Sequence, residues 1–189
     1  MSTSGASLAL KRRGSPSHHS TSLPSVAGRC AIKPRGAGEF NLLAYMFCIR
    51  TMTIDDYEEV IALMKRTPGV TFRDADSREN TARYLLRNPG LSFIAISEGN
   101  VVGCIMSGHD GRRGYLQHLV VQLEHRRQGI ANALVESCLS ALEKLGIKKS
   151  HIDVLSENEA GISYWESQGW KLRTDIRRYS FVRSGGKNV

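Results

Sequence analysis

Residues 119–131 have the sequence LVVQLEHRRQGIA. Apolar residues that favour a strand lead into a polar turn, and a glycine and an alanine then begin a helical pattern. The N–H groups at a helix N-terminus lack intrahelical acceptors and lie at the positive end of the helix dipole, so they can bind an anion. Small residues at positions 129 and 131 leave room for a phosphate group. The stretch predicts a phosphate site, and the alternative is a solvated basic turn.

The helix that follows this turn has the clearest pattern in the chain. Its apolar stripe consists of Ile130, Leu134, Cys138, Ala141, Leu142 and Leu145. Gly146 supplies the C-terminal stop, and a stripe of this kind packs on a sheet. We therefore expect a helix over about 130–145 between strands at 115–121 and 149–155.

The remaining elements complete a mixed fold. Before residue 115 the patterns predict a strand at 47–50, helices at 54–65 and 77–87, and strands at 92–97 and 101–108. After residue 155 they predict a helix at 159–168 and strands at 170–173 and 177–183. The order predicts an α/β (α+β) domain, with a mixed, mostly antiparallel sheet of six to seven strands flanked by about four helices.

Composition divides the chain into three parts. Residues 1–45 are rich in Ser, Gly, Pro and Arg and have few large apolar side chains, so we expect a disordered leader. Its origin is open between an organellar targeting segment, an expression leader and translated upstream sequence, with Met46 or Met52 as the natural start. The folded domain then spans 46–183, and 184–189 form a flexible tail.

Charge and cysteine content narrow the function. The net charge is +8, but residues 1–45 hold six basic side chains against one acid, which leaves little basic excess for the domain. We therefore expect no nucleic-acid partner. No apolar run reaches the roughly 18 residues of a membrane span. The four cysteines form no CxxC pair, so we expect no metal site and a cytoplasmic protein.

The turn at 126–131 resembles the Gln/Arg-x-x-Gly-x-Gly/Ala signature of the GNAT family of N-acetyltransferases. The resemblance covers about residues 47–183 and includes the element order, Asn158 and the pair Gly169-Trp170. The turn lacks the residues of a nucleotide P-loop or a Rossmann turn. The resemblance implies a GNAT-like fold, acetyl-CoA as co-substrate, and acetyl transfer to a primary amine of a small molecule or peptide.

The resemblance also implies which residues meet the cofactor. Backbone groups of Leu119, Val120 and Val121 would contact the pantetheine arm. The pyrophosphate would bind the N–H groups of Arg126, Arg127, Gln128, Gly129, Ile130 and Ala131. Asn158 would face the cofactor, and the strands at 115–121 and 149–155 would separate so that the thioester lies between them.

Acid and base candidates follow from the chemistry of amine acetylation. The attacking amine must lose a proton, and the departing thiolate must gain one. The resemblance places Tyr115 where histone-type members have a glutamate base, and Asp153 in a base position of other members. Asp153 is the first candidate base, with a strand-end ion pair as the alternative. His118 is the second candidate, and alternation places it on one face with Leu116 and Val120, so a packed, hydrogen-bonded histidine is the favoured alternative for it.

No tyrosine occupies the position that the family uses for the catalytic acid. Trp165 occupies the position of the tyrosine that protonates the thiolate in the family, and core packing is the more favoured role for it. Tyr164 lies one position away, about 100° around the helix. Tyr164 is therefore a candidate acid, and water is the alternative.

Two rival functions and the acceptor stay open at this stage. A non-catalytic, acyl-CoA-binding relative with a regulatory role is the main alternative, and a nucleic-acid-binding module ranks far below it. We expect the acceptor to be selected by residues 66–76, by the hairpin at 109–114 and by the C-terminal segment. A homodimer is possible.

Overall fold

The structure is a computed structural model that describes residues 29–30 and 47–183. Its sheet has the order β1-β2-β3-β4-β5-β6. The strands are β1 (Arg29–Cys30), β2 (Phe47–Thr51), β3 (Phe93–Ser97), β4 (Asn100–His109), β5 (Gly114–Val121) and β6 (Ser150–Ile152). Neighbouring strands pair antiparallel except β5 and β6, which are parallel.

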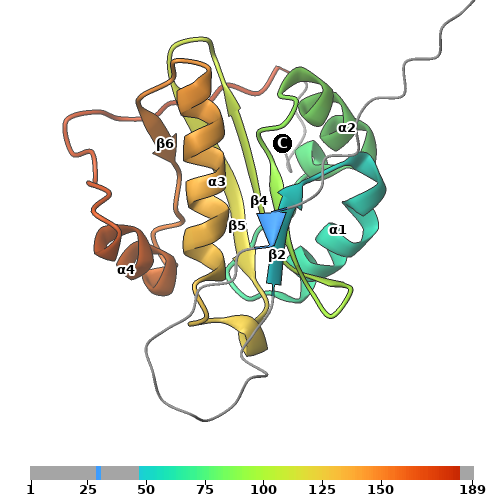
Figure 1. Cartoon of the computed structure of the whole chain (residues 1–189). Coiled ribbons are helices and arrows are strands. Elements are labelled where there is room, and N and C mark those ends of the chain that lie inside the picture. Colours follow the sequence, from blue (N-terminus) through green and yellow to red (C-terminus); the bar gives the residue numbers. More distant parts are fainter. Residues whose placement is uncertain (1–28, 31–46, 184–189) are drawn as a thin grey trace, which may run out of the picture.

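Four α-helices cover the two faces of the sheet. They are α1 (Tyr57–Arg66), α2 (Arg78–Arg87), α3 (Ile130–Lys144) and α4 (Glu159–Ser167). Three short 3-10 helices, η1 (Ile54–Asp56), η2 (Asp74–Asp76) and η3 (Leu123–His125), lie in the connections. Figure 1 shows α3 across one face and α1 and α2 on the other side. The predicted mixed fold is confirmed.

Each face of the sheet has its own apolar core. On the α3 face, buried residues of α3 pack against β4 and β5, with Leu134 and Leu142 fully buried. On the α1 face, Val60 and Leu63 pack against Ile94 of β3. Burial of each such side chain stabilises the fold by about 2 kcal/mol. The turn at 126–131 therefore begins a helix that is anchored along its length by its buried residues.

The β2–α1 connection is held by a buried charge. Asp56 accepts hydrogen bonds from the Arg50 guanidinium at 2.8 and 2.6 Å and from the Thr53 amide at 2.8 Å. Burial raises the pKa of Asp56, but the Arg50 and Thr53 contacts lower it more, so the pKa lies below its usual value. Thr53 and Asp56 form a capping box at the start of η1.

The predicted leader lies mostly outside the described residues. Arg29 and Cys30 pair with Ile49 and Cys48 of β2, which the sequence patterns did not predict. The boundary near residue 46 therefore stays a prediction, as does the tail at 184–189.

The two predicted C-terminal strands are wrong. Among the described residues after α4, none forms a strand. Arg173 pairs with Asp175 two residues later, and Arg178 pairs with Asp153 beside the end of β6. Of these two ion pairs, only that of Arg178 links the segment to another part of the chain, and apolar side chains such as Phe181, 87% exposed, face solvent. Figure 1 shows the chain after α4 passing outside β6 and crossing behind the C-terminal end of α3.

Candidate active site

The turn between η3 and α3 presents its backbone outward. Arg127 has φ +62° and Gly129 has φ +84°, so the chain bends twice through the left-handed region before the helix. No described residue accepts a hydrogen bond from the amides of Gly129, Ile130 or Ala131. A Cβ at Gly129 would meet no atom within 4 Å. The turn therefore has the free donors and the open approach that a phosphate group needs.

The polar side chains of the turn brace the loop. Arg126 donates from Nε to the carbonyl oxygen of Val121 at 3.1 Å, and Gln128 donates to the carbonyl oxygen of Glu124 at 3.2 Å. Arg127 is exposed. Loop geometry thus comes from Arg126 and Gln128, while backbone amides remain available for an anion.

Strand β5 is irregular next to this turn. Cys104 pairs with Val120, but Met106 pairs with Gln117, so two residues of β5 lie opposite one residue of β4. This is a β-bulge, and His118 within it has φ +52°. The parallel pairing of β5 with β6 covers three residue pairs, the last being Leu116 with Ile152. No pairing of β5 with β6 is found beyond that point among the described residues, because β6 ends at Ile152, and the predicted place of the thioester between the strands stays a prediction.

The bulge also changes the side-chain alternation. Leu116 packs in the α3-side core, whereas Val120 packs in the α1-side core. The prediction that His118 shares one face with both residues is therefore wrong, because the extra residue shifts the alternation between them. His118 lies on the side of Val120, toward the connection between α1 and α2.

His118 has a carboxylate partner on that side. Its Nε2 lies 2.7 Å from Oδ1 of Asp76, the last residue of η2. Both side chains are largely buried, at 20% and 13% exposure. Burial raises the pKa of Asp76, but the hydrogen bond and charge of His118 lower it more, so its pKa lies below the usual value. Asp76 lies 42 residues from His118, so no local sequence pattern indicates this pair.

Asp153, the first candidate base from the sequence, has a different environment. It follows β6, its side chain is 68% exposed, and it forms an ion pair with Arg178. The strand-end ion pair considered in the sequence analysis is therefore present.

The candidate acid Tyr164 reaches across to α3. Its hydroxyl donates to Oδ1 of Asn132 at 3.0 Å, and burial raises its pKa to about 12. Trp165 is buried and packs edge-on against Trp170, with ring centroids 4.7 Å apart. The expected core role of Trp165 is confirmed.

Asn158 caps α4. Its Oδ1 accepts a hydrogen bond from the Gly161 amide at 2.9 Å. A Cβ on Gly69, in the α1–α2 connection, would lie 3.5 Å from the Asn158 side chain. Asn158 thus lies between the start of α4 and the loop that carries Asp76, and its predicted contact with the cofactor stays a prediction.

A pocket of about 190 Å³ lies between α2 and the β4–β5 hairpin. Its lining includes Tyr84, Arg87, Asn88, His109, Tyr115 and Gln117. Gln117 directly precedes His118, and residues 109 and 110 belong to the hairpin that the sequence analysis assigns to the acceptor. The Tyr84 hydroxyl is buried without a hydrogen-bond partner among the described residues.

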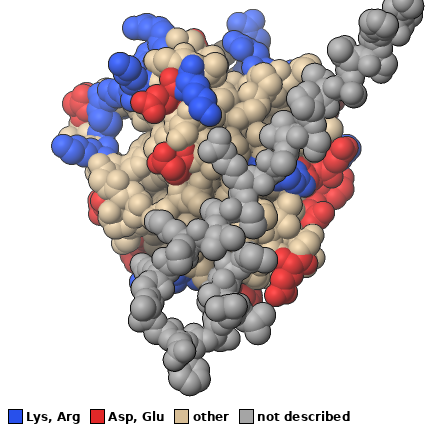
Figure 2. Space-filling model, viewed as in Figure 1, with Lys and Arg blue, Asp and Glu red and all other residues tan. Residues whose placement is uncertain are grey.

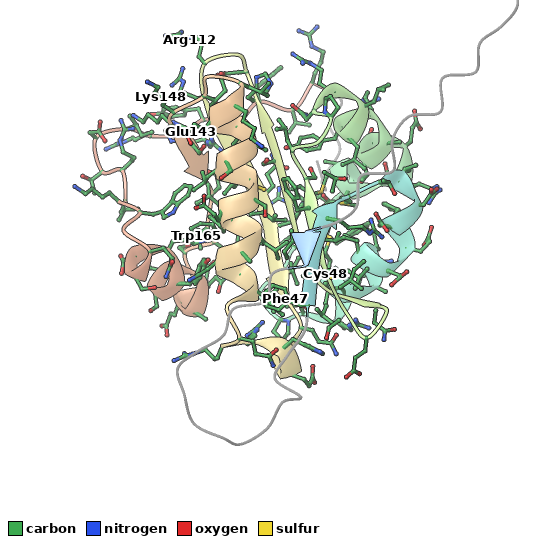
Figure 3. The ribbon with its side chains drawn as sticks, viewed as in Figure 1. Phe47, Cys48, Arg112, Glu143, Lys148 and Trp165 are labelled. Carbon is green, nitrogen blue, oxygen red and sulfur yellow. The ribbon has the colours of Figure 1, made fainter. Side chains whose placement is uncertain are left out.

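Basic side chains gather at the opposite end of α3 from the turn at 126–131. Figure 2 shows Lys and Arg side chains clustered on one end of the visible face. Figure 3 places Arg112, Glu143 and Lys148 at this end, near the C-terminus of α3. Because acids such as Glu143 and Asp110 accompany these cations, this end is a mixed charged surface.

Two features are absent from the described residues: a membrane-spanning helix and a cluster of metal ligands. In the part of the chain that the structure describes, no helix is long and apolar enough to cross a bilayer. Within residues 29–30 and 47–183, no three His, Cys, Asp or Glu residues lie together as a metal-ligand group.

Comparison with known proteins gives the family. The model of the acetyltransferase (GNAT) family matches residues 57–170. An acetyltransferase of Photorhabdus laumondii is 40% identical over 129 residues, which are 66% of this chain and 87% of the relative. One from Sodalis glossinidius is 35% identical over 128 residues, with 68% and 89% coverage. The chain therefore belongs to the GNAT family of acetyltransferases.

A solved structure supports the fold. The PaiA N-acetyltransferase of Thermoplasma acidophilum, determined in complex with coenzyme A, superposes with a TM-score of 0.61 at 20% identity. The match covers 67% of this chain and 91% of that protein.

Proposed function

We propose that this protein moves an acetyl group from acetyl-CoA to a primary amine of a small molecule or peptide. One observation carries the proposal. The amides of Gly129, Ile130 and Ala131, which bond to no described residue, follow β5 through η3 and the turn, and the pairing of β5 with β6 ends at Leu116. Amide donors for a diphosphate and an opening for the pantetheine arm thus lie close together in the chain. The chain also belongs to a family of acetyltransferases.

The proposed binding mode uses the backbone more than side chains. The pyrophosphate accepts hydrogen bonds from the α3 N-terminus, where the helix dipole favours negative charge. Gly129 leaves the approach open. The pantetheine arm passes beside Leu119, Val120 and Val121, and the thioester lies where β5 and β6 part. A structural neighbour that holds coenzyme A is consistent with this choice of co-substrate.

The acceptor amine enters from the α1–α2 side in this proposal. The pocket beside Gln117 and the loop that carries Asp76 both border β5 on that side. The amine then attacks the thioester carbonyl carbon directly, in a complex that holds both substrates.

An amine panel tests the activity. Amines, amino acids, polyamines, aminoglycosides and peptide N-termini are incubated with acetyl-CoA, and released thiol is measured over time. The expected result is thiol release that depends on both enzyme and amine. Initial rates at varied concentrations of both substrates should give intersecting reciprocal plots, because direct attack requires a ternary complex; parallel plots would indicate an acetyl-enzyme instead.

The main alternative gives a different result in the same panel. Trp165, in the position of the family's acidic tyrosine, is buried, which is the observation that favours a non-catalytic relative. For such a protein, acetyl-CoA would raise the thermal midpoint while every amine left thiol release at background.

A further inference from the structure

We propose that Asp76 is a positioning residue that holds His118 as the base for the acceptor amine, an inference that rests on the proposed function. The pair joins two segments that are remote in sequence, the α1–α2 connection and the β5 bulge. The contact of 2.7 Å is short enough for a charge-assisted hydrogen bond. It lies on the face of the sheet from which the amine is proposed to enter.

The contact determines which nitrogen of His118 is basic. An ionised carboxylate can only accept hydrogen bonds, so Nε2 of the neutral ring must carry the proton. The lone pair therefore lies on Nδ1. Among the described residues, none forms a hydrogen bond with Nδ1, and the His118 side chain keeps 20% of its surface exposed. Asp76 thus leaves the imidazole with a free basic nitrogen.

Asp76 itself is anchored from both neighbouring helices. Its Oδ2 accepts a hydrogen bond from the Arg73 amide at 2.8 Å. Its carbonyl oxygen accepts one from the Tyr57 hydroxyl on α1 at 2.9 Å and one from the Thr81 hydroxyl on α2 at 3.4 Å. The carboxylate orientation is consequently set before any substrate arrives, as preorganised catalysis requires.

The bulge positions the ring. With φ +52°, His118 adopts a conformation that residues other than glycine seldom occupy, and such strain is found at functional sites. Regular pairing would shift every side chain of this part of β5 to the other face. The irregular backbone and the Asp76 contact together place the imidazole beside the part of β5 where the strands separate.

The reaction balances with these groups. Nδ1 takes one proton from the acceptor ammonium, and the free amine attacks the carbonyl carbon of the thioester. A C–N bond forms, the C–S bond breaks, and the second nitrogen proton goes to the departing thiolate, directly or through water. His118 then returns its proton to solvent. Asp76 accepts no proton and stabilises the imidazolium by its charge.

Two variants that remove the proton-accepting or charged group test the assignment with an amine that the panel identifies. His118→Gln should lower kcat about 100-fold or more, because general-base catalysis contributes that much. Asp76→Asn should lower kcat at least about 10-fold, because His118 would remain but would lose the carboxylate that orients it as the base. The KM for acetyl-CoA should change little in both. Glu79→Gln, which removes an exposed charge three residues from Asp76, is the matched control and should retain activity.

Nitrogen NMR of the His118 ring separates positioning from simple folding. The neutral wild-type ring should be the Nε2–H tautomer. In Asp76→Asn the amide oxygen should stay on the Arg73 N–H, so the NH₂ group faces Nε2 and the ring should switch to Nδ1–H. This measurement needs no turnover.

Each outcome decides one of the two claims. If no amine is acetylated by the wild type, the proposed function fails, and the ring tautomer still tests the pair. Wild-type kcat in His118→Gln would overturn the base assignment while the acetyltransferase activity stood. A 100-fold loss in Asp153→Asn alone would move the base to Asp153. An Nδ1–H ring in the wild type would overturn the role of Asp76.

Discussion

Asp56, 6% exposed, binds the guanidinium of Arg50 with both carboxylate oxygens, at 2.8 and 2.6 Å. This pair joins β2 to the start of α1. Asp56 also accepts a hydrogen bond from the Thr53 amide. A buried carboxylate with three charge-assisted or backbone hydrogen bonds cannot lose its charge without leaving donors unpaired.

The Arg50–Asp56 pair should make stability depend on pH in the acid range. Because the folded pKa of Asp56 lies below its ordinary value of 3.8, the stabilisation is complete above that value and is lost as pH falls through the folded pKa. Asp56→Asn should therefore cost about 2 kcal/mol at neutral pH and flatten part of the decline below about pH 4. Chemical denaturation at several pH values measures both effects.

Asp55→Asn is the control for that experiment. Asp55 is the exposed neighbour, so the same change of charge should alter the free energy of unfolding by less than about 0.5 kcal/mol. Equal losses in the two variants would contradict the role of the Arg50–Asp56 pair.

A carboxylate at position 129 should block the pyrophosphate. Acetyl-CoA at about 100 times its Kd should stabilise the wild type by about 2.7 kcal/mol. Gly129→Glu should abolish the rise in thermal midpoint, because the charge lies at the amide turn.

Gly129→Gln is the matched variant, with the same size and the same positive φ but no charge. Without ligand, the free energy of unfolding of both variants should fall by about 1 kcal/mol. The Gly129→Gln variant should keep part of the rise in thermal midpoint that acetyl-CoA causes. Equal rises in the Glu and Gln variants would remove the phosphate site.

Tyr164 should act as a link between α4 and α3. Its hydroxyl proton is already donated to Asn132, and its pKa of about 12 keeps it neutral over the physiological range. Tyr164→Phe should lower stability by about 1 kcal/mol, or the thermal midpoint by about 3 °C, and reduce kcat no more than about threefold. A 100-fold loss of kcat with an unchanged thermal midpoint would instead identify Tyr164 as the acid.

Elements that depend on neighbouring residues could be predicted from the sequence. The turn at 126–131 and helix α3 follow from neighbouring residues, because propensity, a glycine and an apolar stripe act within a few positions. The Asp76–His118 pair was missed because its contact depends on how the α1–α2 connection crosses the sheet. The C-terminal strands were overpredicted because local propensity does not supply a partner strand, and no described residue after α4 pairs with one.

Removal of residues 1–45 should leave the domain intact. That segment has too few apolar side chains to add a core, and its described part contributes two residues of β1 at the edge of β2. A chain that begins at Met46 should keep its thermal midpoint within about 3 °C. It should also keep its affinity for acetyl-CoA. A chain that no longer folds would show that the segment belongs to the domain.

The central claim, that this GNAT protein acetylates an amine, is tested most directly by following a labelled acetyl group. Acetyl-CoA with an isotopic label in the acetyl carbonyl is incubated with the enzyme and an amine from the panel, and the products are analysed by mass spectrometry. The account predicts one labelled acetyl group on the amine nitrogen for each coenzyme A released, with the reaction strongly reduced in Gly129→Glu. A wild-type protein that is stabilised by acetyl-CoA, yet leaves every amine unlabelled, would contradict it.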